Sequence, residues 1–179
     1  MLSSWREFDH CKVPIVKARV EEIVRRVRGP RVLEVGCNEG WVAKAVMEER
    51  GFECVAVDNR LEARIASEQC FGIEVINADA NKLPFADSEF DTVIMGELLE
   101  HMPNPGVALA EGIRVSKGHI IITIPIGAYW LGEPTHLWEL NGAVVEHDQG
   151  IVSPYNKHVF IIEWDLRRRI TTDGRIEPV

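Results

Sequence analysis

A chain of 179 residues has the length of one domain, and its composition, 46% hydrophobic and 27% charged, is that of a globular protein. Its 20 lysines and arginines against 28 aspartates and glutamates give a net charge of −8, which disfavours binding to nucleic acid or to an anionic membrane. No segment predicts a signal peptide or a membrane span, and the 4 cysteines lack zinc-site spacing. We therefore expect a soluble, cytoplasmic protein with reduced thiols.

Helices and strands are predicted to alternate along the first two thirds of the chain. After an N-terminal arm (residues 1–12), apolar residues at three- and four-residue steps predict a helix from Val13 to Val27, ended by Gly29-Pro30. Its basic stripe, which includes Arg19 and Arg26, could meet an anionic substrate, but we interpret it as a solvated face. Further helices are expected over 41–50, 61–69 and 105–115, and strands over 31–35, 54–57, 73–77, 90–95 and 120–124.

The last third of the chain breaks this alternation. Residues 143–146 and 158–164 are predicted to form two strands of an antiparallel hairpin, with its turn at Pro154–Asn156. Residues 126–142 are expected to be a loop on the substrate side, and 167–179 a polar tail. The sequence thus predicts a single α/β domain over 1–179, with a Rossmann-like, doubly wound, mostly parallel seven-stranded sheet.

The predicted site lies just after the strands, because open α/β sheets bind ligands at the carboxyl ends of their strands. Gly36 and Gly40 bracket a tight turn that lets the backbone approach a ligand. Asp58, after the second strand, is placed to accept both hydroxyls of a ribose, and Asp79 to accept from an adenine amino group. The full candidate set for cofactor binding is Glu34, Gly36, Cys37, Asn38, Gly40, Asp58, Asn59, Asp79, Ala80, Gly96 and Glu97.

The glycine spacing separates one class of cofactor from another. A dinucleotide-binding loop has the pattern G-x-G-x-x-G, but here Trp41 stands where its last glycine would fall. No G-x-x-x-x-G-K-[ST] sequence is present either, which excludes a P-loop.

The run Glu34-x-Gly36-x-Asn38-x-Gly40 resembles the nucleoside-methionine loop of class I S-adenosylmethionine-dependent methyltransferases. Asp58 and Asp79-Ala80 match the ribose-side and adenine-side positions of that family, and Gly96 to His101 match the segment after its fourth strand. The resemblance covers about residues 32–125 and is closest to small-molecule methyltransferases that include quinone-biosynthesis enzymes. It implies S-adenosylmethionine as cofactor and in-line methyl transfer to a small molecule, with a hydroxyl acceptor ahead of nitrogen or carbon.

The chain departs from the family pattern at two places. Asn38 replaces the usual middle glycine, and asparagine tolerates the left-handed backbone such a turn needs. The cover helix that the family places before its last two strands is shortened or missing, since only Glu139 to Gly142 separate Trp138 from the predicted strand. A second copy of the chain, as a homodimer, or the N-terminal arm would then cover the exposed sheet face.

Two histidines are candidates for the general base that a hydroxyl acceptor requires. His101 follows the fourth predicted strand and His136 follows the fifth, and an imidazole suits proton transfer near neutral pH. A purely structural role for either histidine stays open. The aromatic residues Tyr129, Trp130 and Trp138 around His136 predict an organic substrate pocket or, equally, a core patch.

Three different functions stay open beside this one. The first is a metal-dependent RNA methyltransferase, because Glu97, Glu100, His101 and His136 resemble the divalent-metal set of small-RNA terminal 2′-O-methyltransferases. Metal-free relatives share the Glu-x-x-Glu-His run, however, so no metal ligand is assigned. The second is an NAD-type oxidoreductase, and the third is a non-catalytic nucleoside-binding module.

Overall fold

The computed structural model describes residues 4–7, 12–125, 135, 137, 150–156, 159–165, 168–170 and 176–178. The helices in this part of the chain include η1 (Trp5–Glu7) and η3 (Leu99–His101), which are 3₁₀ turns, and the α-helices α1 (Pro14–Arg26), α2 (Trp41–Arg50), α3 (Leu61–Phe71) and α4 (Pro105–Val115). The strands are β1 (Arg31–Val35), β2 (Glu53–Val57), β3 (Val75–Ile76), β4 (Thr92–Gly96), β5 (His119–Pro125), β6 (Gly150–Asn156), β7 (Val159–Asp165), β8 (Arg168–Ile170) and β9 (Ile176–Pro178).

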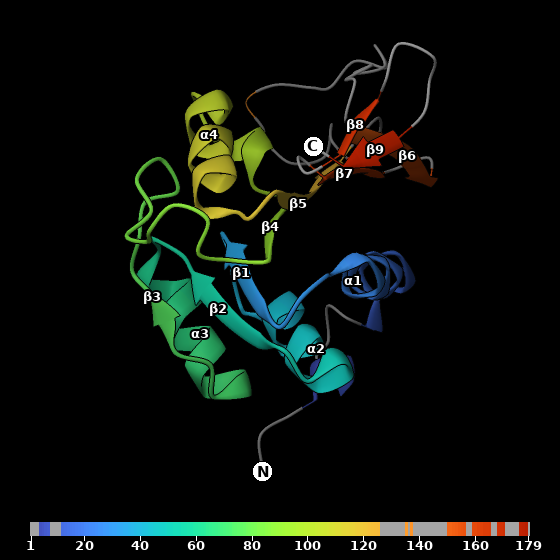
Figure 1. Ribbon diagram of the computed structural model, residues 1–179. Coiled ribbons are helices and arrows are strands. Elements are labelled where there is room, and N and C mark those ends of the chain that lie inside the picture. Colours follow the sequence, from blue (N-terminus) through green and yellow to red (C-terminus); the bar gives the residue numbers. More distant parts are fainter. Residues whose placement is uncertain are drawn as a thin grey trace.

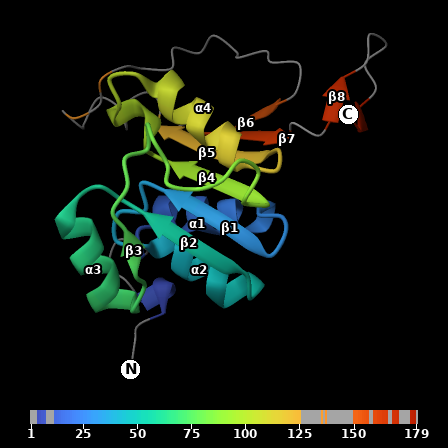
Figure 2. The same ribbon diagram turned by 60° about the vertical axis from the view of Figure 1, so that its left-hand side comes forward.

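The described strands β1 to β7 form one seven-stranded sheet in the order β3-β2-β1-β4-β5-β7-β6 (Figure 2). Strands β1 to β5 run parallel, whereas β7 is antiparallel to both β5 and β6. The strand order reverses between β1 and β4, which is where open α/β sheets form a ligand crevice. The predicted fold, a mostly parallel α/β sheet with an antiparallel C-terminal pair, is confirmed.

Helices cover both faces of the sheet (Figure 1). On one face α1 and α2 pack against alternate strand residues such as Val32, Ile94 and Ile121. On the other face α4 and η3 pack against the intervening residues, among them Leu33 and Val93. Because successive residues of a strand point to opposite faces, a strand buried on both sides is mostly apolar, as β5 is apart from the buried His119 and Thr123.

Part of the N-terminal arm packs against α2. Trp5 is fully buried, and its Nε1 donates a hydrogen bond to Glu49 Oε1 over 2.9 Å. Arg6 bridges Glu49 and Glu21, so the arm is tied to both α1 and α2. The N-terminal arm was one of two candidates, with a second copy of the chain, to cover an exposed sheet face. Its described residues contact α1 and α2.

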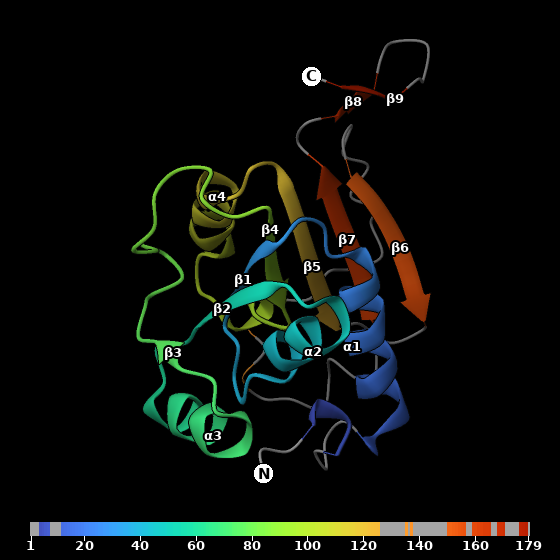
Figure 3. The same ribbon diagram turned by 60° about the horizontal axis from the view of Figure 1, so that its bottom comes forward.

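The C-terminal hairpin differs from its prediction. The partner of β7 is β6, and Pro154 and Asn156, predicted to form the turn, belong to β6 itself (Figure 3). Proline within a sheet is largely confined to edge strands and bulges, and Pro154 fits both, because β6 is the edge strand and its register shifts between Pro154 and Asn156. The predicted strand over 143–146, the missing cover helix and most of the 126–142 loop lie outside the described residues. The tail contains a second antiparallel pair, β8 with β9.

A buried ion-pair network joins the end of α1 to β7. Glu163 on β7 pairs with Arg26 over 2.7 Å and with Arg28 over 2.6 Å, and it accepts from His119 Nε2 over 3.0 Å. The prediction that the basic stripe of α1 is solvated is therefore wrong for Arg26, whose side chain is only 13% exposed. Within the described part of the chain, no helix has the length and apolar character needed to cross a membrane.

Candidate active site

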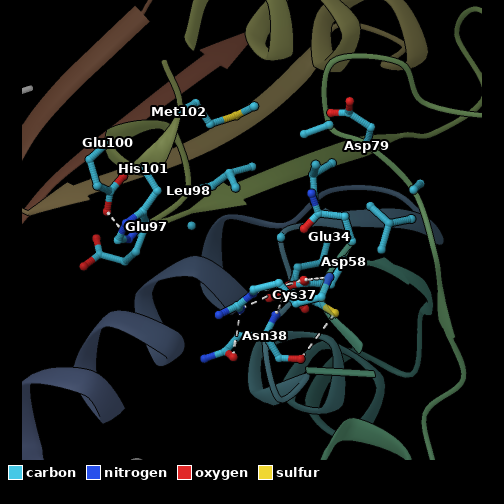
Figure 4. A pocket seen from close by; sticks show the side chains of 18 of the residues that line it. Glu34, Cys37, Asn38, Asp58, Asp79, Glu97, Leu98, Glu100, His101 and Met102 are labelled. Atoms are coloured by element: carbon cyan, nitrogen blue, oxygen red, sulfur yellow. Dashed lines mark hydrogen bonds and ion pairs between the residues drawn. The ribbon is translucent and has the colours of Figure 1, made fainter. Parts of the chain in front are cut away.

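A cavity of about 1170 Å³ opens at the carboxyl ends of β1, β2 and β4. It is bordered by every predicted cofactor residue except Gly40, and by His101 (Figure 4). The residues predicted to bind substrate, Tyr129, Trp130 and Trp138, and the second predicted base, His136, lie outside the described residues. One cavity thus collects side chains from turns that are far apart in the sequence.

The turn after β1 forms one wall of the cavity. The backbone N–H groups of Gly36 and Cys37 donate to Val57 O over 2.9 and 3.0 Å, which ties the turn to β2. Gly36 has φ +73°, and a Cβ there would lie 2.7 Å from Leu98 Cδ1. Asn38 has φ +49°, so the asparagine adopts the left-handed conformation expected of it. Gly40, also left-handed, precedes α2 and supports the turn from behind the cavity.

Asp58 is only 5% exposed and is held by the backbone on both sides. Its Oδ2 accepts from Asn38 N over 3.0 Å and its Oδ1 from Arg60 N over 2.9 Å. The Arg60 guanidinium also reaches Asp58 and donates to Asn38 Oδ1 over 3.0 Å. Arg60 was not predicted from the sequence, because an exposed arginine next to an acidic residue carries no recognisable motif.

Glu34 and Cys37 are shielded from solvent. Glu34 Oε2 accepts from Ala43 N over 2.8 Å, which links β1 to the first turn of α2. Burial raises the pKa of Glu34 to about 8, so it carries a proton at neutral pH. Burial likewise raises the pKa of the Cys37 thiol, which therefore stays protonated and unreactive. Both residues border the cavity as parts of its frame.

The wall after β4 carries a second group of charged side chains. Glu97, with φ +51°, pairs with Arg19 of α1 over 2.7 Å. Arg19 borders the cavity and its side chain is 13% exposed, so the prediction of a solvated basic stripe is wrong here as well. His101 Nδ1 lies 3.0 Å from Thr135 Oγ1, and its Nε2 lies 4.0 Å from Glu100 Oε1.

From the sequence, Glu100 was considered only as a possible metal ligand. Its side chain is fully buried, and burial, followed by the charge of Glu97, raises its pKa to about 8. Among the described residues, no three histidine, cysteine, aspartate or glutamate side chains are grouped so that they could hold a metal ion.

The donor set suits S-adenosylmethionine. Asp58 offers carboxylate oxygens at the edge of the turn, and the turn has glycine at position 36, where a Cβ would meet the Leu98 side chain on the cavity wall. Arg19 supplies a cation for a carboxylate, and the cavity volume exceeds that of a typical small-molecule pocket, about 300–1,000 Å³. There is room for a nucleoside cofactor and a second small molecule.

Residues 33–122 match the family model described as "Methyltransferase domain". This chain belongs to that family, whose class I members use S-adenosylmethionine as cofactor. A solved S-adenosylmethionine-dependent methyltransferase from Archaeoglobus fulgidus superimposes with a TM-score of 0.62 at 26% identity, covering 72% of this chain and 63% of that one.

Two curated relatives are methyltransferases of quinone biosynthesis by name. A demethylmenaquinone methyltransferase from Renibacterium salmoninarum is 35% identical over 55% of this chain and 41% of its own length. A ubiquinone biosynthesis O-methyltransferase from Alkalilimnicola ehrlichii is 32% identical over 66% of this chain and 53% of its own length. The chain thus spans about half the length of the curated relatives it matches.

Proposed function

We propose that the protein transfers a methyl group from S-adenosylmethionine to a small-molecule acceptor, most readily to a hydroxyl oxygen. The observation that carries this proposal is the turn from Gly36 to Gly40, in which Gly36, Asn38 and Gly40 have left-handed backbone angles. The Asn38 N–H donates a hydrogen bond to the buried Asp58, and both residues border a cavity with room for two ligands. The names of the quinone-biosynthesis relatives support a small, ring-containing acceptor. A cytoplasmic location and a homodimer stay predictions.

Each part of the cofactor has a counterpart on the cavity wall. Asp58 accepts from the ribose hydroxyls, Asp79 and Ala80 lie on the adenine side, and the backbone at Gly36 and Cys37 faces the methionine portion. Arg19 binds the methionine carboxylate in place of its present partner, Glu97.

The bound cofactor supplies an electrophilic methyl group. The protein holds the acceptor atom in line with that methyl group and keeps water out of the cavity. His101, at the opposite end of the cavity from Asp58, takes the proton that a hydroxyl acceptor must lose (Figure 4).

Ligand-induced stabilisation tests the cofactor, and labelled methyl transfer tests the reaction. At 100 times its dissociation constant, a ligand stabilises a protein by about 2.7 kcal/mol, which corresponds to a rise in melting temperature of about 5–10 °C for a chain of this size. We expect this rise with S-adenosylmethionine or S-adenosylhomocysteine and no rise with NAD.

The rival functions predict other results. Stabilisation by NAD alone would establish the oxidoreductase. Binding of S-adenosylmethionine without label in any phenol, amine or acid would establish the nucleoside-binding module. Methyl transfer to RNA that a chelator abolishes would establish the metal-dependent RNA methyltransferase.

A further inference from the structure

We propose that Glu100 and His101 form a proton-sharing pair at the acceptor end of the cavity, and that the acceptor is an alcohol, phenol or amine without negative charge. This inference rests on the proposed function and names a residue and a substrate class for it. His101 is the group that faces the cavity, and Glu100 acts through His101, so Glu100 is a positioning residue.

The geometry of the pair is unusual for a structural carboxylate. The Glu100 side chain is fully buried, borders the cavity, and has neither oxygen hydrogen-bonded within the described part of the chain. Leaving a buried carboxyl group unpaired is costly, which makes a purely structural role a poor explanation. Glu100 Oε1 lies 4.0 Å from His101 Nε2, within the distance of an ion pair. Figure 4 shows the Glu100 carboxyl group directed toward the His101 ring.

The backbone around η3 holds this pair in place. The Leu137 N–H donates to Glu100 O over 2.8 Å, and Thr135 Oγ1 lies 3.0 Å from His101 Nδ1. Thr135 thereby fixes one ring nitrogen and leaves Nε2 on the side of Glu100. The separation of 4.0 Å is longer than a hydrogen bond, and such contacts commonly tighten when the ligands of an enzyme bind.

The charges around the pair determine when it accepts a proton. Burial and the charge of Glu97 favour the protonated form of Glu100, whereas the backbone N–H of Glu100 itself and the charge of Arg19 favour the ionised form. At neutral pH the Glu100 carboxyl group therefore holds a proton, and its ionised form appears as the pH rises toward 8. The observed titration belongs to the pair and not to either residue alone.

The same charges select the acceptor. Glu97 makes this end of the cavity acidic, and Glu100 adds a second negative charge when it ionises. Because the methionine carboxylate of the cofactor engages Arg19, no cation is left there for a carboxylate acceptor, which is repelled. In the transfer step, a lone pair on the acceptor oxygen or nitrogen forms the bond to the methyl carbon. The carbon–sulfur bond breaks with its electrons left on sulfur, and the acceptor's proton passes to Nε2 of the neutral His101 ring, where the ionised Glu100 stabilises the positive charge that forms. His101, 37% exposed, then returns the proton to solvent.

The first test does not require turnover. The His101 ring is titrated by NMR, with and without S-adenosylhomocysteine, its signal being assigned by its loss in His101→Gln. We expect the His101 ring to titrate together with the Glu100 carboxyl group in the wild type, and we expect Glu100→Gln to shift that titration. Glu62→Gln, an exposed position on α3, is the matched control and leaves the titration unchanged. An unchanged titration in Glu100→Gln overturns the pair.

The second test uses a phenol, an aromatic amine and a benzoate of similar size as acceptors of labelled methyl. At pH 9 we expect Glu100→Gln to lower kcat about tenfold or more, with KM for S-adenosylmethionine unchanged, and Glu100→Asp to restore part of the rate. The pH at which the rate levels off falls in Glu100→Gln. Transfer to the benzoate ahead of the other two, or to none of them, overturns the acceptor class.

The two proposals fail separately. If S-adenosylhomocysteine does not bind, the proposed function fails, and the titration of the free protein still decides whether Glu100 and His101 share a proton.

Discussion

Replacing Asp58 by alanine is the sharpest perturbation of the cofactor site. A carboxylate offers about four lone-pair positions, and the N–H groups of Asn38 and Arg60 occupy two of them. Two positions remain for the ribose hydroxyls. The contacts from the Arg60 guanidinium, at 3.3 and 3.4 Å, are long, and that side chain is 59% exposed, so it yields to the ligand.

The structure also sets the expected magnitude. Each hydrogen bond to a charged group contributes about 1.5–3 kcal/mol, so losing two weakens binding by about 3–6 kcal/mol, or about 10²- to 10⁴-fold in Kd. Isothermal titration calorimetry with S-adenosylhomocysteine measures this change. Arg60→Ala, which removes the competing side chain but keeps the carboxylate, should bind about as well as the wild type or better.

Asp87→Ala serves as the control, because Asp87 is an exposed partner of Arg114 far from the cavity. A folded Asp58→Ala protein whose Kd stays within about threefold of the wild type would refute the reasoning, since losing even one such bond costs about tenfold.

Two further predictions concern stability. Gly40→Ala places a Cβ 2.4 Å from Ser67 Oγ at a residue with φ +82°, so we expect a loss of about 1–3 kcal/mol in the free energy of unfolding by urea. Gly106→Ala, where a Cβ meets nothing within 4 Å, is its control, and equal stability of the two variants would contradict the strain at Gly40. Glu34 has its pKa raised to about 8 by burial, so the folded protein keeps a proton that the unfolded chain releases above about 4.5. Its contribution to stability is therefore complete below pH 4.5 and is lost as pH rises to 8. Glu34→Gln should flatten that decline in urea titrations at several pH values, and an unchanged slope would show that burial of Glu34 does not govern it.

The sequence predicted well what depends on short stretches of chain. The helices over 41–50 and 105–115 occur at those residues, because their apolar spacing and their flanking glycine and proline are local signals. The Gly36–Gly40 turn followed for the same reason, since a left-handed backbone requires particular residues at particular positions. With Asp58 at the end of the next strand, these local features predicted residues that border one cavity.

Only the tertiary structure decided which distant residues meet there. Arg19 of α1 reaches Glu97, and Thr135 reaches His101, although nothing in their own surroundings in the sequence marks them. The strand that pairs with β7 in the C-terminal hairpin was mispredicted for a related reason. Residues 143–146 were expected there and β6 is found, because strand pairing depends on the rest of the sheet as well as on the strand itself. Sequence periodicity states which residues are apolar. How the helices pack across the sheet determines which polar side chains are buried next to each other. It also determines whether a carboxylate such as Glu100 is shielded from solvent.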